Sequence, residues 1–456
     1  MPGLFGILEL GKRTLISQQM AQSIVGNNIA NVNTEGYSRQ RTALEQVGTL
    51  RTPWGTIGLG VQVKSITRMR DALTDRLYRD ANGAYKEWET KAQFMRQIDS
   101  IFTEIDEAGI GSKMDAFFNA WQDLANDPES VQPRIALRES AIALTDAFQQ
   151  TAKKLKWQKE NINSRVSKVV DEFNAIIKKI AELNSQIPAA GAKNSNANEL
   201  LDERDRLLDR LAELADIQVF ERSNLGIAVY IGSTSLVEGA FYQELTTEVV
   251  NNNDLPVVNV LGPDGNELNL QSGELKALLD LRDEIIPEYE DALNTLARNM
   301  VEQVNAYHKV GYTLDGETGF NFFDNRYITA ATIRLDPQIE EDVNKIIAAA
   351  EDAAGDNTQA MRIAALKNLP LLDDFSFRDY YASLVTKVGL DGQTAEDLSR
   401  SNEILTRQTM LQRESTIGVS LDEEMVDMIR YQQSYMAASR MIATVDQMIE
   451  AIINLR

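Results

Sequence analysis

The chain has 456 residues, a formal net charge of −22, one histidine and no cysteine. This composition excludes disulfides, thiol nucleophiles and zinc sites made from several cysteine and histidine ligands, and it leaves His308 as the one residue that could serve a histidine-dependent catalytic site. The acidic excess argues against binding to nucleic acid or to anionic membrane surfaces. Few glycines and prolines favour long helices.

The first predicted element is a helix over residues 4–32, with a heptad ladder that is apolar at both ends and polar in the middle. The ladder positions are Leu4, Leu8, Gly11, Leu15, Gln18, Gln22, Val25, Ile29 and Val32. An asparagine-rich turn follows, and Gly36 ends the helix because glycine adopts a positive φ at low cost. Residues 37–45 are expected to be extended, and glycines between 55 and 60 predict a β-hairpin.

Helical periodicity dominates the chain from Asp71 onward. The expected helices cover residues 71–105, 114–126, 131–187, 196–215, 274–309, 338–351, 358–366, 377–388 and 395–416. Pro188 is expected to end the third of them and Pro287 to kink or break the fifth. Short strands rich in Val and Ile are expected at 217–220, 227–231, 236–245, 257–261, 268–270 and 327–335. The sequence therefore predicts a mainly α fold: a long helical bundle with a small β-rich region.

The last predicted helix begins at Leu421, where Ser420 and Glu423 form a capping box. Its ladder positions are Met425, Met428, Gln432, Tyr435, Ser439, Ile442, Asp446, Ile449 and Ile453. This helix is also apolar at its ends and polar in the middle, so it can pair as a coiled coil with the helix at the other end of the chain. The polar positions expected to fix the register of the pair are Gln18, Gln22, Gln432 and Ser439.

Charge is distributed unevenly between the ends and the middle of the chain. Residues 1–45 carry four Lys or Arg and three Asp or Glu, and residues 415–456 carry three and six. The two ends together therefore hold −2 of the −22, and −20 lies between them. Nearly neutral ends can pack against copies of themselves without strong repulsion, while the acidic middle keeps the surface soluble.

No motif for catalysis, cofactor binding or metal binding stands out. Residues 6–13 match most of a phosphate-binding loop, but Arg13 replaces the required Ser or Thr and no strand precedes the loop. His308 is interpreted as an ordinary helix-end residue favoured by the helix dipole, and residues 315–317 as a polar turn. No apolar run reaches the roughly 18 residues of a membrane-spanning helix, and the N-terminus lacks the pattern of a cleaved secretory signal.

Five segments resemble a known family of bacterial proteins. The N-terminal segment reads Asn28-Ile29-Ala30-Asn31-Val32-Asn33-Thr34-Glu35-Gly36-Tyr37-Ser38-Arg39-Gln40. It is similar to the N-terminal signature of flagellar rod, hook and hook-associated proteins, and residues 418–424 and 431–440 resemble the matching C-terminal signature. Residues 198–205 and 304–311 resemble the inner helical segment of the hook-associated members, which rod and hook proteins lack.

The resemblance implies a non-enzymatic structural protein of the flagellar axis, without a cofactor, at the junction between hook and filament. It implies export through the flagellar type III apparatus without a cleaved signal, and hence an extracellular location in the flagellum. The implied partners are other copies of the chain, the hook protein, the second hook–filament junction protein and a cytoplasmic export chaperone on the C-terminal region.

The resemblance and the two ladders together define an expected assembly interface. Its residues are Leu4, Leu8, Leu15, Val25, Asn28, Ile29, Asn31, Asn33, Thr34, Gly36, Tyr37, Arg39, Gln40, Leu421, Met425, Met428, Tyr431, Gln432, Tyr435, Arg440, Ile442, Ile449 and Ile453. The expected domains are a terminal coiled coil (1–45 with 415–456) and a helical inner domain (46–215 with 273–414) that includes a β-rich part (216–272). Longer family members carry an outer β domain after a segment resembling Gly319–Phe323, and the short stretch here predicts its absence.

Three alternatives share some of these features. A hook or rod protein would share the terminal signatures, but not the long inner helical region. A cytosolic helical scaffold or adaptor would share the acidity and the ladders, but it gives no reason for the asparagine-rich motif. An enzyme that uses Asp and Glu alone is the third, although no local pattern singles out a pair of carboxylates.

Overall fold

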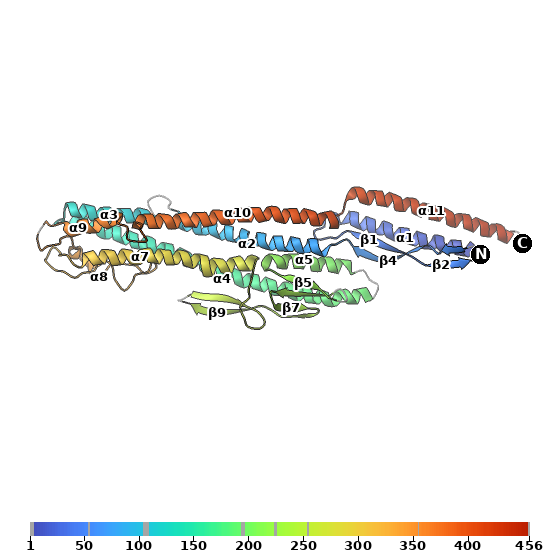
Figure 1. Ribbon diagram of the computed structural model, residues 1–456, viewed down its shortest axis with the longest axis horizontal. Coiled ribbons are helices and arrows are strands. Elements are labelled where there is room, and N and C mark those ends of the chain that lie inside the picture. Colours follow the sequence, from blue (N-terminus) through green and yellow to red (C-terminus); the bar gives the residue numbers. More distant parts are fainter. Residues whose placement is uncertain are drawn as a thin grey trace.

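The computed structural model describes residues 4–52, 55–103, 109–192, 197–222, 226–252, 255–353 and 355–454. The molecule is elongated, and its long helices run along its length (Figure 1). Both chain ends lie at the same end of the molecule, where α1 (Leu4–Ala30) and α11 (Leu421–Asn454) are side by side. The other helices form a body, with a small group of strands on its flank.

The body helices bury apolar stripes against one another in one core. They are α2 (Ala72–Phe102), α3 (Ile110–Asn126), α4 (Val131–Ala192), α5 (Asn198–Leu214), α6 (Glu274–Asp280), α7 (Ile286–His308), α8 (Pro337–Glu341), α9 (Thr358–Ala365) and α10 (Phe377–Ile417). α10 lies along α2, and α3 lies against α4. Phe117, Trp121 and Phe322 are fully buried in mutual ring contact. The prediction of a mainly α bundle is confirmed, and none of the helices in the described ranges has the apolar length that a bilayer crossing requires.

The predicted end of a helix at Pro188 is wrong. α4 continues through this proline to Ala192. Proline inside a helix removes one backbone hydrogen bond and is normally unfavourable. Here Leu183 and Ile187, on the turns just before it, are buried against Leu201 of α5, so tertiary packing holds the last turns of α4 in place.

Two helices were expected where α10 runs unbroken through Gly389 and Gly392, and this prediction is also wrong. The Cβ position at Gly392 lies 3.9 Å from Met95 of α2, and Val388 is fully buried nearby. Burial of this face outweighs the low helix propensity of glycine, about 1 kcal/mol per residue. The break predicted near Pro287 is confirmed, because a π-helical turn, Leu281–Ile285, separates α6 from α7.

The flank carries a four-stranded antiparallel sheet in the order β5-β6-β7-β8 and a separate β9–β10 pair. The strands are β5 (Gln218–Glu221), β6 (Ile227–Ile231), β7 (Thr234–Glu238), β8 (Phe241–Tyr242), β9 (Thr246–Asn252) and β10 (Leu255–Leu261). The strand predicted at 236–245 is divided because Gly239 turns the chain with a φ of 62°, and no prediction covers β9. Residues 268–270 form no strand, although the predicted turn before them is present between Gly262 and Gly265.

Two further predictions in the second half of the chain are wrong. Residues 327–335 fold into turns rather than a strand, because several of their amides bond to carbonyls three or four residues back. Only Leu335 makes a strand-like bridge, to Phe323. The helix predicted over 338–351 ends already at Glu341, and a single 3-10 turn follows it.

α1 packs on two neighbours, α11 on one side and a pair of strands on the other. The strands of this region are β1 (Gln40–Gln46), β2 (Thr49–Thr52), β3 (Gly55–Gly58) and β4 (Val61–Arg68), with β1 paired to β4 and β2 to β3. The predicted hairpin is therefore confirmed. The Ser17 hydroxyl of α1 donates to the carbonyl of Val61 at 3.5 Å. The expected domain boundary at residue 45 falls within β1, whose partner β4 packs on α1.

His308 is the last residue of α7, so its predicted place at a helix end is confirmed, but its ring is buried in the core and is not held there by the helix dipole. Its ring is fully buried and lies against Trp121 and Phe322. Nδ1 lies 2.8 Å from the carbonyl oxygen of Phe320, and Nε2 accepts from the backbone amide of Ile347 at 3.0 Å. Burial lowers the pKa of His308 from 6.5 to about 4, so the neutral ring serves as a core polar bridge.

We expect His308 to make stability depend on pH in a defined window. The pKa of His308 is lower in the folded protein than in the unfolded chain. The free energy of unfolding should therefore be unaffected by His308 above about pH 6.5, and should fall by about 3 kcal/mol as the pH drops towards 4. His308→Gln, with a neutral side chain, should show a flatter dependence of unfolding free energy on pH in this window. Urea titrations at a series of pH values measure the difference, and parallel curves for both proteins would contradict it.

Candidate assembly interface

The predicted ladder of α1 lies on a buried face of the helix. Leu4, Leu8, Leu15 and Ile29 are half-buried, and Val25 is buried. A second buried face carries Ser17, Ala21, Ile24 and Asn28. The ladder therefore identifies one face of α1 correctly, while the face that packs on β1 and β4 has no counterpart in the prediction.

Gly11 is the point at which α1 and α11 approach closely. A Cβ atom at this position would lie 2.6 Å from Cγ1 of Ile442. Real Cβ atoms do not make contacts this short, so a larger residue would push the helices apart. The two ladders predict the pairing of Gly11 with the helix that carries Ile442, and the structure places them together.

The predicted ladder of α11 is half right. Met428, Ile442 and Ile449 are half-buried, as expected for positions facing α1. The other row is displaced by one residue. The buried or half-buried positions are Glu424, Tyr431, Ala438 and Val445. The predicted positions Met425, Gln432, Ser439, Asp446 and Ile453 are exposed, as are Leu421, Tyr435 and Arg440.

The reason for this displacement is that α11 is apolar on more than one face. Its exposed large apolar residues are Leu421, Met425, Val426, Ile429, Tyr435, Met436, Met448, Ile452 and Ile453. A helix with apolar residues on both sides offers two heptad registers of similar quality. Gln432 and Ser439 consequently point to solvent, and the prediction that they fix the register of the pair is wrong.

Asn28 holds the end of α1 against the start of β1 and the start of α11. Its side-chain amide donates to the carbonyl of Gln40 at 3.0 Å and to the Glu424 carboxylate at 2.9 Å. Its oxygen accepts from the Gln40 amide at 3.0 Å and from the Tyr37 hydroxyl at 2.8 Å. Burial and the nearby carboxylates raise the Tyr37 pKa to about 12, so this phenol stays a donor. Only an amide side chain supplies both donors and acceptors in this geometry.

Arg39 completes the contact between the two chain ends. Its Nε donates to Glu424 and a terminal nitrogen donates to Glu423, both at 2.7 Å. Burial alone would lower the pKa of Arg39, but these hydrogen bonds and charges raise it above its ordinary value. Its backbone amide also donates to the carbonyl of Ile417, the last residue of α10. Since Glu423 bonds to Arg39, only the serine half of the predicted capping box forms, with Ser420 Oγ 3.5 Å from the Glu423 amide.

The predicted residues between these contacts form an ordered turn. Asn31 donates to the carbonyl and the side chain of Asn27, both at 3.0 Å, and accepts from Thr34 at 3.1 Å. α1 ends at Ala30, so the prediction that Gly36 ends the helix is wrong; Gly36, with a φ of 78°, instead lies in the turn that follows. Asn33 and Thr34 are exposed at the tip of the turn. The asparagine-rich signature thus shapes the loop that delivers Arg39 to α11.

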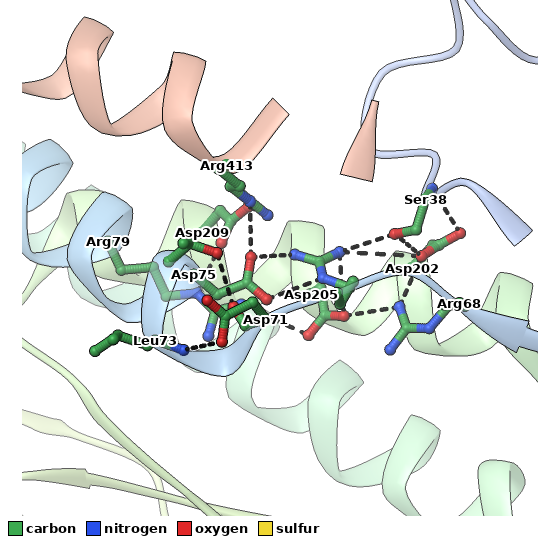
Figure 2. Close-up of polar contacts among 12 residues, drawn as sticks. Ser38, Arg68, Asp71, Leu73, Asp75, Arg79, Asp202, Asp205, Asp209 and Arg413 are labelled. Carbon is green, nitrogen blue, oxygen red and sulfur yellow. Dashed lines mark hydrogen bonds and ion pairs between the residues drawn. The ribbon is translucent and has the colours of Figure 1, made fainter. Parts of the chain in front are cut away.

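A row of aspartates on α5 receives the segments that join the terminal helices to the body, and sequence reasoning missed it. Figure 2 shows Asp202, Asp205 and Asp209 together with Ser38, Arg68, Asp75, Arg79 and Arg413. Asp202 accepts from the hydroxyl of Ser38 at 2.6 Å and from Arg68 at 2.7 Å. The aspartates are spaced by three and four residues, so the sequence places them on one side of the helix. Because α5 carries many charges of both signs, this side was interpreted as solvent-exposed.

In the part of the chain that the structure describes, no three His, Asp or Glu side chains are grouped as metal ligands. A cleft of about 870 Å³ lies beside the aspartate row, between the turn 31–37, α5 and the connection from α10 to α11. The site is therefore a set of intramolecular contacts and exposed apolar faces. Its chemistry is that of recognition and packing.

Comparison with protein families identifies the chain. The model of the flagellar hook-associated protein FlgK helical domain matches residues 95–323, half of the chain. The chain belongs to the flagellar hook-associated protein FlgK family. Its ends match two further models: the flagella basal body rod protein model at residues 8–37 and the C-terminal model of flagellar basal body rod FlgEFG proteins at 410–455. It is thus a structural, hook-associated protein of the bacterial flagellum.

Individual relatives span the whole chain. It is 28% identical to flagellar hook-associated protein 1 of Bacillus subtilis (strain 168), over 100% of this chain and 99% of that protein. Identity to flagellar hook-associated protein 1 of Escherichia coli (strain K12) is 25%, over 97% and 98% of the two chains. The fold is similar to the flagellar hook junction protein FlgK from Burkholderia pseudomallei, with a TM-score of 0.68 and 14% identity over 76% of this chain and 100% of that one.

We expect the two glutamates that bind Arg39 to differ strongly in energetic weight. Glu424 is 2% exposed, whereas 61% of the Glu423 side chain is exposed. Glu424→Gln should lower the opening free energy of the first turns of α11 by about 2–4 kcal/mol, since it breaks a buried ion pair. Glu423→Gln, the matched control, should cost less than about 1 kcal/mol. Amide hydrogen exchange at the start of α11 measures both, and equal effects would refute the assignment.

Proposed function

We propose that this protein is a subunit of the junction between hook and filament, and that it assembles through the uncovered apolar faces of its terminal helices. The observation that carries the proposal is the set of exposed apolar residues on α11. Within the chain, α11 has one principal packing partner, α1, and that contact leaves the other faces open. α1 itself exposes Phe5, Ile16 and Met20.

The energetics of these faces favour contacts with further copies. Contiguous exposed apolar surface is uncommon in proteins that stay monomeric. Burying one large aliphatic side chain contributes about 1.5–3 kcal/mol, and the terminal helices expose several of them. The ends carry little net charge, so copies can approach without strong repulsion. Such head-to-tail contacts generate a helical tube rather than a closed dimer.

The proposed domain organisation follows the packing. The terminal assembly domain consists of residues 4–68 and 421–454, and the inner domain consists of the helical body with the strands of residues 218–261. The alignment with flagellar hook-associated protein 1 of Salmonella typhimurium extends over 550 positions, more than the 456 residues of this chain. Segments of that relative therefore have no counterpart here, which supports the absence of a large outer β domain.

The finer parts of the proposal rest on the family. The chain would leave the cell through the flagellar type III apparatus without a cleaved signal and reside outside the cell in the flagellar axis. Its neighbours would be further copies, the hook protein and the second junction protein, and an export chaperone would hold the C-terminal region beforehand. No catalysis is part of this role. The ring of His308 supports that view, because it is fully buried and both of its nitrogens are engaged by the backbone.

The test introduces a charge into the outer face of α11. Val426 is 65% exposed in the chain, so Val426→Asp should leave the fold of the isolated protein intact while it blocks packing between copies. Cells that carry this variant should build hooks but lack filaments. Val310→Asp is the matched control, because Val310 is 60% exposed in the turn that follows α7, in the body. Electron microscopy with labelled antibody should place the wild-type protein at the hook tip.

Normal filaments on Val426→Asp cells would reject assembly through this face. Loss of the hooks themselves would favour a hook or rod protein instead. A defect of equal size in the Val310→Asp cells would show that the effect does not depend on α11.

A further inference from the structure

The chain crosses twice between the terminal domain and the body, once from Arg68 to Arg70 and once after Arg413, and both crossings meet α5. The loop that contains Ser38, between α1 and β1, reaches α5 from within the terminal domain. We infer that the aspartate row of α5, formed by Asp202, Asp205 and Asp209, is a positioning site that sets the angle at which the terminal domain leaves the body. This role goes beyond assembly itself, because it concerns the shape of each single chain.

The Ser38 loop and the first crossing bind the N-terminal part of the row. Ser38 donates to both oxygens of Asp202, through its amide at 3.2 Å and its hydroxyl at 2.6 Å. Arg68, the last residue of β4, bridges Asp202 and Asp205 at 2.7 and 2.8 Å. Arg70 lies 3.2 Å from Asp205 and also donates to the Ser38 hydroxyl. The same two carboxylates thus fix both segments.

The second crossing binds the C-terminal part of the row. Arg413 lies in the last turn and a half of α10, close to the connection that leads into α11. It pairs with Asp209 of α5 and with Asp75 of α2, both at 2.7 Å, and its guanidinium lies over the Tyr78 ring at 4.7 Å from the centroid. Asp209 pairs on its other oxygen with Arg79 at 2.7 Å (Figure 2).

Charge is balanced within this network. Four arginines face four aspartates, and every one of their side chains is at most one-fifth exposed. Burial alone would raise the pKa of Asp205, but the charges of Arg70, Arg68 and Arg79 lower it below its ordinary range. Ion pairs that are this well shielded keep a defined geometry, in contrast to surface pairs, which are screened by water and salt.

Apolar packing does not provide an alternative support for the angle. The large buried cluster of the body contains no residue of α1, β1–β4 or α11 among the described residues, and the main packing partners of α1 are α11, β1 and β4. The cleft of about 870 Å³ beside the joint leaves room on one side of the network. Without the ion pairs, the terminal domain would therefore be free to tilt.

The experiment uses the full chain, whose lack of cysteine allows site-specific spin labels. Ser185→Cys on α4 and Ala443→Cys on α11 are exposed positions on the two sides of the joint, and the distance between labels is measured by electron–electron double resonance. Asp209→Asn should broaden the distance distribution and add distances absent from the parent. Asp209→Glu, which keeps the charge, should retain the parental distribution. Glu199→Gln, an exposed acid on the same helix, is the control for lost charge alone.

A second label pair keeps the result interpretable. Gln19→Cys and Ala443→Cys lie on α1 and α11, both exposed, and their distance should not change in Asp209→Asn if the terminal domain stays folded. Broadening of the first pair alone supports the positioning role. The role would be overturned if the distance distribution of the first label pair were unchanged in both Asp209→Asn and Asp202→Asn. Equal broadening of that distribution in Glu199→Gln would overturn it as well. Neither result depends on filament assembly, so the outcome is independent of the proposed function.

Discussion

Glu424 is a buried carboxylate on which the joining of the two chain ends depends. It lies almost 400 residues from Asn28 and Arg39 in sequence, yet it accepts hydrogen bonds from both. Closing so long a loop costs entropy, and burying a carboxylate costs desolvation energy. Both costs are offset only if its partners are in place, so the contact selects one relative position of α1 and α11. The apolar ladder residues then add stability to a register that Glu424 has defined.

The different roles of Glu424 and of the apolar ladder residues explain which parts of the structure the sequence could predict. Periodicity identified the terminal helices, their pairing and Gly11 opposite the helix with Ile442, because these depend on residue spacing within single helices. It failed to distinguish Ala438 from Ser439 as the inward position, because α11 has apolar residues on several faces. The predicted register residues were polar and uncharged. The residue that fixes the register of α1 and α11 in the structure is Glu424. A glutamate is ordinarily found on the surface, and this one is buried because Arg39 pairs with it.

The aspartate row of α5 and the wrong boundaries have a common cause. The partners of Asp202, which are Ser38 and Arg68, lie more than 130 residues away in the sequence. No local sequence pattern around Asp202 indicates that they contact it. Likewise, α4 continues past Pro188 because Leu183 and Ile187 meet Leu201, and β9 forms because β10 pairs with it along its whole length. Local rules describe what a segment prefers, whereas these features depend on what a distant segment supplies.

Three kinds of interaction therefore act in three parts of the molecule. The body is held by a continuous apolar core, the joint by shielded ion pairs, and the terminal domain by a narrow apolar seam with one buried ion pair, Arg39 with Glu424. In the terminal domain, α11 leaves large apolar side chains uncovered, and the net charge of the two end segments is close to zero. A strong charge on these faces would prevent contact between copies, whereas a neutral, apolar body would make contacts along its whole length. Because −20 of the −22 charges lie outside the two end segments, charge repulsion between copies is weakest at the terminal helices, through which we propose that the protein assembles.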